Sequence, residues 1–213
     1  MRHWPENQIK IVMIRHGETA SNKEQRYLGK TDEPLSEEGI KVLQEAKDAG
    51  VYPEIDYLFS SPMKRCLETA KILYPDKEPI IIPDWEEMNF GIFEGKNYID
   101  LQKDERYQAW IDSNGTLPFP EGESREDFDN RCKQGFQRMI SYLMNLLKQV
   151  KDSKLTIGLI VHGGTIMSLL SRYHGGEYFN YQVPNGNGYI CSLKGSLKKP
   201  EIAEIKKLWE NKL

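Results

Sequence analysis

The sequence of 213 residues has few cysteines and no long apolar run. No stretch approaches the roughly 18 consecutive apolar residues that span a bilayer, and the polar first ten residues lack the apolar centre of a secretory signal. The three cysteines, Cys66, Cys132 and Cys191, form neither a C-x-x-C pair nor a zinc-ligand spacing. We therefore expect reduced thiols in a cytoplasmic protein that has no membrane partner.

The sequence also lacks an excess of basic residues. Lys and Arg number 29 and Asp and Glu number 32, which gives a formal net charge of −3 with neutral histidines. Non-specific binding to nucleic acid depends on basic surface, so this balance argues against a nucleic-acid partner. Aromatic residues make up 10% of the chain, more than is typical of disordered chains. The length predicts one globular domain over residues 1–213. Residues from about 88 to 125, part of which is less regular in sequence, are a candidate for a partial lid.

Common signatures of nucleotide and metal sites are missing as well. The chain has no Walker loop, no G-x-G-x-x-G turn and no H-E-x-x-H helix. The ligands that could gather around a metal are His16, His162 and Glu87, and two arginines, Arg15 and Arg65, would compete for the same space. We therefore expect no metal and no cofactor.

Short apolar runs rich in β-branched residues alternate with amphipathic segments along the chain. The predicted strands are 9–14, 55–60, 79–82, 155–161, 188–193 and 202–207, with a solvated turn at 194–200. The predicted helices are 37–48, 62–73, 98–110, 124–150 and 164–173. This alternation predicts an α/β fold, a three-layer α/β/α sandwich with a mostly parallel sheet.

Chemically active side chains follow four of the predicted strands. Arg15 and His16 follow the first strand, and Arg65 lies just beyond the second. Glu87 follows the third, and His162 follows the strand at 155–161. Because ligands of open α/β sheets bind outside the carboxyl ends of the strands, we expect these five side chains to lie together.

This set of groups suits the chemistry of phosphate esters. Two guanidinium groups supply fixed charge and forked donors for phosphoryl oxygens. One histidine can attack phosphorus and carry a covalent intermediate, while the other donates to the phosphoryl oxygens. A carboxylic acid can protonate the leaving alcohol and then deprotonate the incoming water. Together these groups would make a two-step phosphomonoesterase in which arginines do the neutralising that magnesium does elsewhere.

The chain carries four segments, 11–19, 60–70, 87–95 and 161–164, that occur in this order. Together they resemble the motifs of the histidine phosphatase superfamily, also called phosphoglycerate mutase-like. The resemblance extends over residues 9–187, and it implies the phosphoglycerate mutase-like fold.

The resemblance implies a role for each matching residue. His16 would be the phosphorylated nucleophile. Glu87 would be the proton donor, because the family acid stands three residues before a Phe-Gly pair, and its neighbour Glu86 is the alternative. The implied phosphate pocket and substrate contacts are Arg15, Arg65, His162, Asn22, Arg26, Tyr27 and Gly163.

Within the superfamily, phosphatases are more similar to this sequence than mutases are. Mutases carry a longer insertion with extra arginines after the acid, whereas residues 88–125 contain only Arg106 and Arg125. The segment 26–36 resembles the α-ribazole phosphatases of cobalamin assembly. One departure is Leu28, which stands where many broad phosphatases place a glutamine near the substrate.

We therefore expect a metal-independent phosphomonoesterase whose partner is a small-molecule phosphomonoester, with α-ribazole 5′-phosphate as the named candidate. Two other activities stay open, a phosphoglycerate mutase and a broad-specificity sugar or nucleotide phosphatase. A phosphate-sensing pseudophosphatase is the non-enzymatic alternative. A homodimer is also left open.

Overall fold

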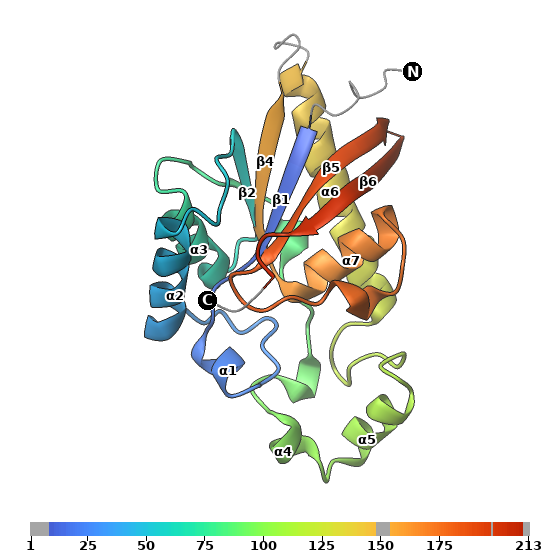
Figure 1. Ribbon diagram of the computed structural model, residues 1–213. Helices are drawn as coiled ribbons and strands as arrows, with labels where there is room; N and C mark the ends of the chain where they lie inside the picture. Colours follow the sequence, from blue (N-terminus) through green and yellow to red (C-terminus); the bar gives the residue numbers. More distant parts are fainter. Residues whose placement is uncertain (1–8, 148–153, 197, 211–213) are drawn as a thin grey trace.

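The computed structural model describes residues 9–147, 154–196 and 198–210 (Figure 1). A six-stranded sheet has the order β3-β2-β4-β1-β5-β6. Neighbours among β3, β2, β4 and β1 pair in parallel, while β5 is antiparallel to both β1 and β6. The predicted α/β fold with a mostly parallel sheet is confirmed. The strands are β1 (Ile9–Arg15), β2 (Tyr57–Ser60), β3 (Ile80–Ile81), β4 (Leu155–Val161), β5 (Gly188–Ser196) and β6 (Lys199–Lys207).

Helices cover both faces of the sheet (Figure 1). None of the described helices is long and apolar enough to cross a membrane. The α-helices are α1 (Ala20–Lys23), α2 (Glu37–Asp48), α3 (Lys64–Leu73), α4 (Tyr98–Leu101), α5 (Glu105–Asp112), α6 (Arg125–Leu147) and α7 (Gly163–Tyr173). Three short 3₁₀ helices are η1 (Pro83–Trp85), η2 (Gly91–Phe93) and η3 (Tyr178–Tyr181).

The central strand β1 shows how one apolar run builds two cores. Successive side chains of a strand point to opposite faces of its sheet. Ile11 and Met13 join the core on the face covered by α6 and α7. Val12 and Ile14 join the core beneath α2 and α3. A continuous apolar run is therefore needed here, because both faces of the strand are buried.

Two helices begin where the sequence predicts. The Ser36 hydroxyl accepts a hydrogen bond from the Gly39 amide at 3.0 Å and caps α2. The Ser124 hydroxyl accepts from the Asp127 amide at 3.0 Å at the start of α6. Both contacts satisfy amides that a helix leaves unpaired at its first turn. The predicted end of the helix that starts at Ser124, at 148–150, lies outside the described residues.

The single helix predicted over 98–110 is wrong. The structure has α4 and α5 in its place, separated by residues 102–104. The Asp104 side chain accepts from the Arg106 amide at 2.9 Å and so starts a second helix. An aspartate can stabilise a helix start in this way as well as lie inside a helix, and here the capping role prevails.

The turn predicted at 194–200 is also wrong. Strand β5 continues to Ser196 and β6 starts at Lys199, with Lys194 paired to Glu201 and Gly195 to Pro200. Strand β6 lies at the edge of the sheet. Lysines and prolines are common on edge strands, where they oppose pairing with other chains, so their presence did not exclude a strand.

Residues 88–125, here called the lid segment, lie below the carboxyl ends of the parallel strands in Figure 1 and include η2, α4 and α5. An aromatic cluster holds the segment together. Phe93, Tyr107, Trp110 and Phe119 lie within contact of one another, and Tyr27 joins them from the loop after α1. The lid segment is therefore anchored to a loop that lies close in space to the end of β1.

We predict that Gly135→Ala lowers the free energy of unfolding, although alanine normally gains about 0.5–1 kcal/mol over glycine inside a helix. A Cβ at this position would lie 2.4 Å from Nε1 of buried Trp85. Overpacking of this kind costs about 1–3 kcal/mol, so the clash prevails. Urea unfolding checks the result. Exposed Gln134→Ala in the same helix is the control and should change stability by less than about 0.5 kcal/mol. A stabilised Gly135→Ala protein would contradict the packing described here.

Candidate active site

The five side chains singled out from the sequence lie together at the carboxyl edge of the sheet. Strand β1 ends at Arg15, and the His16 amide donates to the Val161 carbonyl oxygen at 3.0 Å. His162 occupies the position before α7, and its ring centroid lies 5.2 Å from that of His16. Arg65 lies in the first turn of α3. The parallel strands β1, β2 and β4 therefore deliver these groups to one place.

The His16 ring is held in one protonation state. Its Nδ1 lies 2.7 Å from the Gly17 carbonyl oxygen, which can only accept a hydrogen bond. Nδ1 therefore carries the proton, and Nε2 keeps its lone pair. Burial, followed by the positive charges of Arg65 and Arg15, lowers the pKa of His16 well below 6.5. The ring is neutral near pH 7 and can act as a nucleophile.

Arg15 and Arg65 each keep one buried donor unused. Nη1 of Arg15 donates to the Val183 carbonyl at 2.8 Å. Nη1 and Nη2 of Arg65 donate to the carbonyls of Thr31 and Gly29, both at 2.9 Å. The Nε of each arginine is buried and has no hydrogen-bond partner. Because an unpaired buried donor is costly, the two Nε–H groups indicate a place for an anion.

His162 is the second neutral histidine of the site. Its Nε2 lies 2.8 Å from the Ser61 hydroxyl. Burial, and then the charge of Arg65, lowers the pKa of His162 well below 6.5. Gly163 opens α7 next to Arg15, where a Cβ on the glycine would lie 3.5 Å from the arginine Nε. The positive end of α7 therefore adds to the field around the anion place.

Glu87 faces the same place from the segment after η1. Only 9% of its surface is exposed, and burial raises the pKa of its carboxyl above 4.5. Hydrogen bonds from the amides of Met88 (2.9 Å) and Gly164 (3.4 Å) oppose that rise. A Cβ on Gly164 would lie 2.5 Å from Glu87 Oε1, so a glycine is needed for this approach. Its neighbour Glu86 does not face the cavity described below.

Arg131 positions the segment that carries Glu87, and the sequence analysis missed it. Its Nη1 donates to the carbonyls of Asp84 (3.0 Å) and Glu86 (2.6 Å), and its Nη2 donates to that of Glu87 (2.9 Å). An ion pair with Glu123 at 2.7 Å holds the guanidinium in place. Arg131 lies on α6, and the apolar pattern of this helix predicted only that one of its faces packs in the core.

Asn185 is a second residue that the sequence analysis missed. Its Nδ2 donates to Asn22 Oδ1 at 2.9 Å and to the His16 carbonyl at 3.1 Å. Asn22 Oδ1 also accepts from the Thr19 amide at 3.3 Å. The two asparagines therefore form one wall beside the nucleophile candidate.

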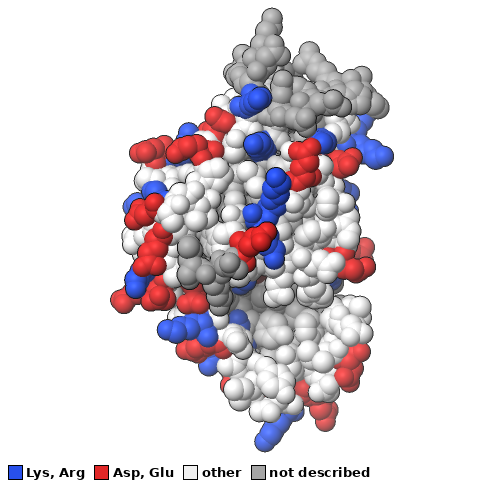
Figure 2. Space-filling view, in the orientation of Figure 1, with Lys and Arg blue, Asp and Glu red and all other residues white. Residues whose placement is uncertain are grey.

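A cavity of about 620 Å³ opens onto this site. Arg15, Asn22, Glu87 and Gly163 line its polar end. His16 lies behind them with 3% of its surface exposed, and Arg65 and His162 do not line the cavity. Figure 2 shows a hollow between the body of the molecule and its lower lobe, with mainly uncharged residues around it. The apolar lining consists of Tyr27, Leu28, Met88, Phe90, Tyr98, Tyr107, Trp110, Leu117, Phe119, Met167 and Phe179.

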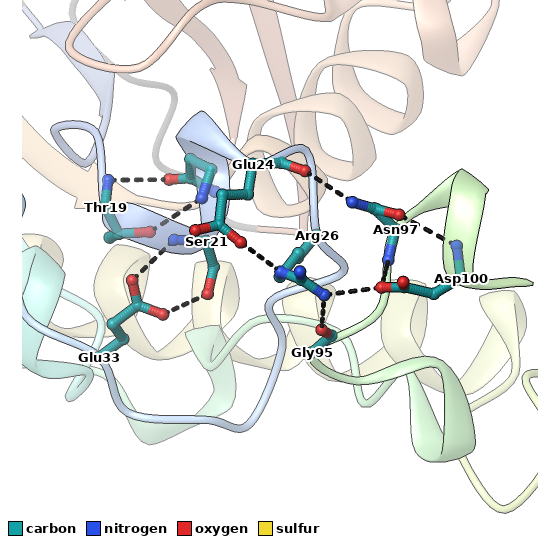
Figure 3. A network of polar contacts seen from close by, with 9 residues as sticks. Thr19, Ser21, Glu24, Arg26, Glu33, Gly95, Asn97 and Asp100 are labelled. Carbon is teal, nitrogen blue, oxygen red and sulfur yellow. Dashed lines mark hydrogen bonds and ion pairs between the residues drawn. The ribbon is translucent and has the colours of Figure 1, made fainter.

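Arg26 and Tyr27, expected to contact substrate, line the cavity but have partners in the protein. Figure 3 shows those of Arg26. The Arg26 guanidinium forms ion pairs with Glu24 at 2.6 Å and Asp100 at 2.7 Å. It also donates to the Gly95 carbonyl at 2.7 Å. Arg26 thus ties the loop after α1 to the lid segment, while the Tyr27 ring belongs to the aromatic cluster.

Within the described part of the chain, no three His, Cys, Asp or Glu side chains are grouped so that they could hold a metal ion. The three cysteines are buried and form no disulfide.

We predict that Arg131→Lys lowers the free energy of unfolding by about 1.5–3 kcal/mol, the range for hydrogen bonds to charged groups. A lysine keeps the charge, but its compact ammonium cannot reach several carbonyls and the Glu123 carboxylate together. Thermal and urea unfolding measure the loss. Arg138→Lys is the matched control, since Arg138 lies on the same helix, pairs with Asp84 and is 67% exposed. Equal, small effects of both variants would show that Arg131 does not hold this segment.

Comparisons with known proteins agree with this geometry. The family model of the histidine phosphatase superfamily (branch 1) matches residues 11–207. A 2,3-bisphosphoglycerate-dependent phosphoglycerate mutase from Bifidobacterium longum is 31% identical, over 89% of this chain and 88% of its own. An adenosylcobalamin/alpha-ribazole phosphatase from Escherichia coli is 28% identical, over 78% and 80%. The crystal structure of the alpha-ribazole phosphatase from Shigella flexneri superposes with a TM-score of 0.72 at 25% identity, over 91% and 94%. The chain belongs to the histidine phosphatase superfamily, branch 1.

Proposed function

We propose that the protein is a metal-independent phosphomonoesterase that works through a phosphohistidine at His16. One observation carries this proposal. Two guanidinium groups, those of partly buried Arg15 and fully buried Arg65, present buried and unused Nε–H donors beside a histidine whose Nε2 lone pair is available. A phosphoryl group placed there would satisfy the donors and meet the nucleophile at the same time.

In the first step, His16 Nε2 attacks phosphorus and the bond from phosphorus to the ester oxygen breaks. The Glu87 carboxyl gives its proton to the departing oxygen, so an alcohol leaves and a carboxylate stays. Arg15, Arg65 and the amide of Gly163 offset the charge on the phosphoryl oxygens, and His162 donates to them. The raised pKa of Glu87 favours the protonated form that this step needs.

In the second step, a water molecule attacks the phosphorus of the phosphohistidine. The Glu87 carboxylate takes a proton from the water, and the bond between phosphorus and His16 Nε2 breaks. Inorganic phosphate forms, and both side chains return to their starting states. The hydrogen bond from Nδ1 to the Gly17 carbonyl, at 2.7 Å, keeps Nε2 unprotonated and aimed in both steps.

The cavity favours a hydrolase over a phosphoglycerate mutase. A mutase must hold a small acidic substrate in two orientations, which calls for free cationic groups around it. Here Arg26 is engaged by Glu24 and Asp100. Arg106 pairs with Asp104 and lies away from the cavity. Arg125 also lines the cavity, but its charge is offset by Asp129 at 3.2 Å. The remaining walls are largely apolar, which suits a larger leaving group.

For the substrate, we propose α-ribazole 5′-phosphate. This compound is a nucleoside phosphate whose planar base suits a cavity lined with aromatic rings. The names of the relatives from Escherichia coli and Shigella flexneri support the choice. Release of inorganic phosphate from a panel that includes α-ribazole 5′-phosphate and 3-phosphoglycerate tests it. Conversion of 3-phosphoglycerate into its 2-isomer, without release of phosphate, would favour the mutase.

We predict that rapid quench with ³²P-labelled ester traps a phosphoenzyme that is labile in acid and stable in base. His16→Ala should abolish both the trapped label and turnover, because it removes the nucleophile. EDTA should leave the wild-type burst intact, because arginines rather than a metal offset the phosphoryl charge. Normal turnover by His16→Ala, or loss of activity in EDTA that a divalent ion restores, would contradict the mechanism.

We predict that Glu87→Gln slows the burst of an alkyl phosphate by about 10²–10⁴-fold and that of p-nitrophenyl phosphate far less. The alkoxide needs a proton to leave, whereas the nitrophenolate does not. With the alkyl ester, wild-type activity should fall as pH rises through the pKa of Glu87, which lies above 4.5, because the acid form is lost. Glu87→Gln should lack this decline.

Arg65→Ala is the comparison for that experiment. It removes charge stabilisation that every ester shares, so both esters should slow together. Equal slowing of the two esters by Glu87→Gln would show that Glu87 is not the acid, and Glu86→Gln would then be the variant to measure.

A further inference from the structure

A stacked pair of side chains, Arg125 and Tyr178, lies on the cavity wall and has no part in the mechanism above. The guanidinium carbon of Arg125 lies 3.2 Å from the centroid of the Tyr178 ring. At that separation the planar guanidinium can only lie flat against the ring. The two residues come from distant segments, the start of α6 and the 3₁₀ helix η3. Their contact therefore closes one side of the cavity.

The outer face of the Arg125 guanidinium is available to a ligand. Its Nε pairs with Asp129 at 3.2 Å, four residues along the same helix. No described residue accepts a hydrogen bond from its Nη atoms, and 33% of the side chain is exposed. One flat face of the cation rests on Tyr178, and Arg125 and Tyr178 both line the cavity, so the face of the cation away from Tyr178 is the one that a ligand in the cavity can stack on.

This pair lies close to the proposed proton donor. The Tyr178 hydroxyl donates to the Gly164 carbonyl at 3.4 Å, and the Gly164 amide donates to Glu87 at 3.4 Å. Glu87 is the proposed proton donor to the ester oxygen, so the ester oxygen lies beside it. A group attached to that oxygen therefore extends from Glu87 into the part of the cavity that Arg125 and Tyr178 border.

The other walls of the cavity are mainly apolar and aromatic. They include Tyr27, Phe90 and Phe119, whose rings contact one another. An aromatic ring bound in the cavity would contact these aromatic side chains and could stack on the planar guanidinium of Arg125. Guanidinium groups stack on aromatic rings, and the attraction grows when water is excluded.

We propose that Arg125, held flat by Tyr178, is a specificity-determining residue that selects phosphomonoesters with a planar aromatic leaving group. The inference rests on the proposed phosphomonoesterase activity and adds the contact that recognises the leaving group. A second anionic group is the less favoured ligand, because Asp129 already offsets the charge of Arg125. Stacking uses the plane of the guanidinium and does not require its net charge.

The test compares Arg125→Lys with the wild type on 1-naphthyl phosphate, glycerol 2-phosphate and 3-phosphoglycerate. Lysine keeps the charge and can still pair with Asp129, but it cannot lie flat on Tyr178. The ratio of kcat/KM for the naphthyl ester to that for the glycerol ester should fall about three- to tenfold. Arg138→Lys, on the same helix and outside the cavity, should leave the ratio unchanged.

Binding separates this inference from the proposed function. Calorimetry with 1-naphthylmethylphosphonate and methylphosphonate, neither of which can be hydrolysed at its carbon–phosphorus bond, gives the same comparison without turnover. If Arg125→Lys weakens binding of the naphthyl ligand selectively, the role of Arg125 is supported, whether or not any ester is hydrolysed. Absence of hydrolysis would overturn only the proposed phosphatase activity. An unchanged ratio, equal losses for both ligands, or a larger loss for 3-phosphoglycerate than for the naphthyl ester would overturn the role of Arg125.

Discussion

The burial of two guanidinium groups beside two imidazoles is the constraint on which this site depends. Removing water from Arg15 and Arg65 is costly, and backbone carbonyls satisfy only part of each group. The same loss of water keeps His16 and His162 neutral and raises the pKa of Glu87. One physical cause thus prepares the anion place, the nucleophile and the acid. A bound anion would accept hydrogen bonds from the Nε–H groups of Arg15 and Arg65. The atoms that bind the anion are therefore the same atoms that stabilise it during the reaction.

Chemistry and recognition occupy different ends of the cavity. The polar end is lined by Arg15, Asn22, Glu87 and Gly163, which lie at or after the carboxyl ends of β1, β3 and β4. The far end is built from the lid segment, the loop after α1 and η3, which are joined by aromatic contacts and by the ion pairs of Arg26. This division would let the far end of the cavity vary while the strands that carry the polar end stay fixed.

The strands and the residues that follow them were predictable from the sequence. Buried parallel strands leave continuous apolar runs, and their carboxyl ends must gather at one edge, so Arg15, His16 and His162 could be placed together. Arg131 and Asn185 could not be found in this way. Both side chains donate to main-chain carbonyls, and such partners leave no spacing in the sequence. The sequence did not predict the division between α4 and α5, because an aspartate such as Asp104 occurs both inside helices and as a helix cap.

The way in which Arg131 holds the acid has a consequence for how the protein tolerates mutation. Its guanidinium contacts the carbonyl oxygens of residues 84, 86 and 87, and every amino acid carries that oxygen. The side chain of Glu86 can therefore be exchanged without the loss of any of these acceptors. Substitution of Glu86 leaves the Glu87 carboxyl where it is, whereas an insertion or deletion of one residue there would move it. The position of the Glu87 carboxyl is thus insensitive to the side chain at residue 86 and sensitive to the length of the segment before it.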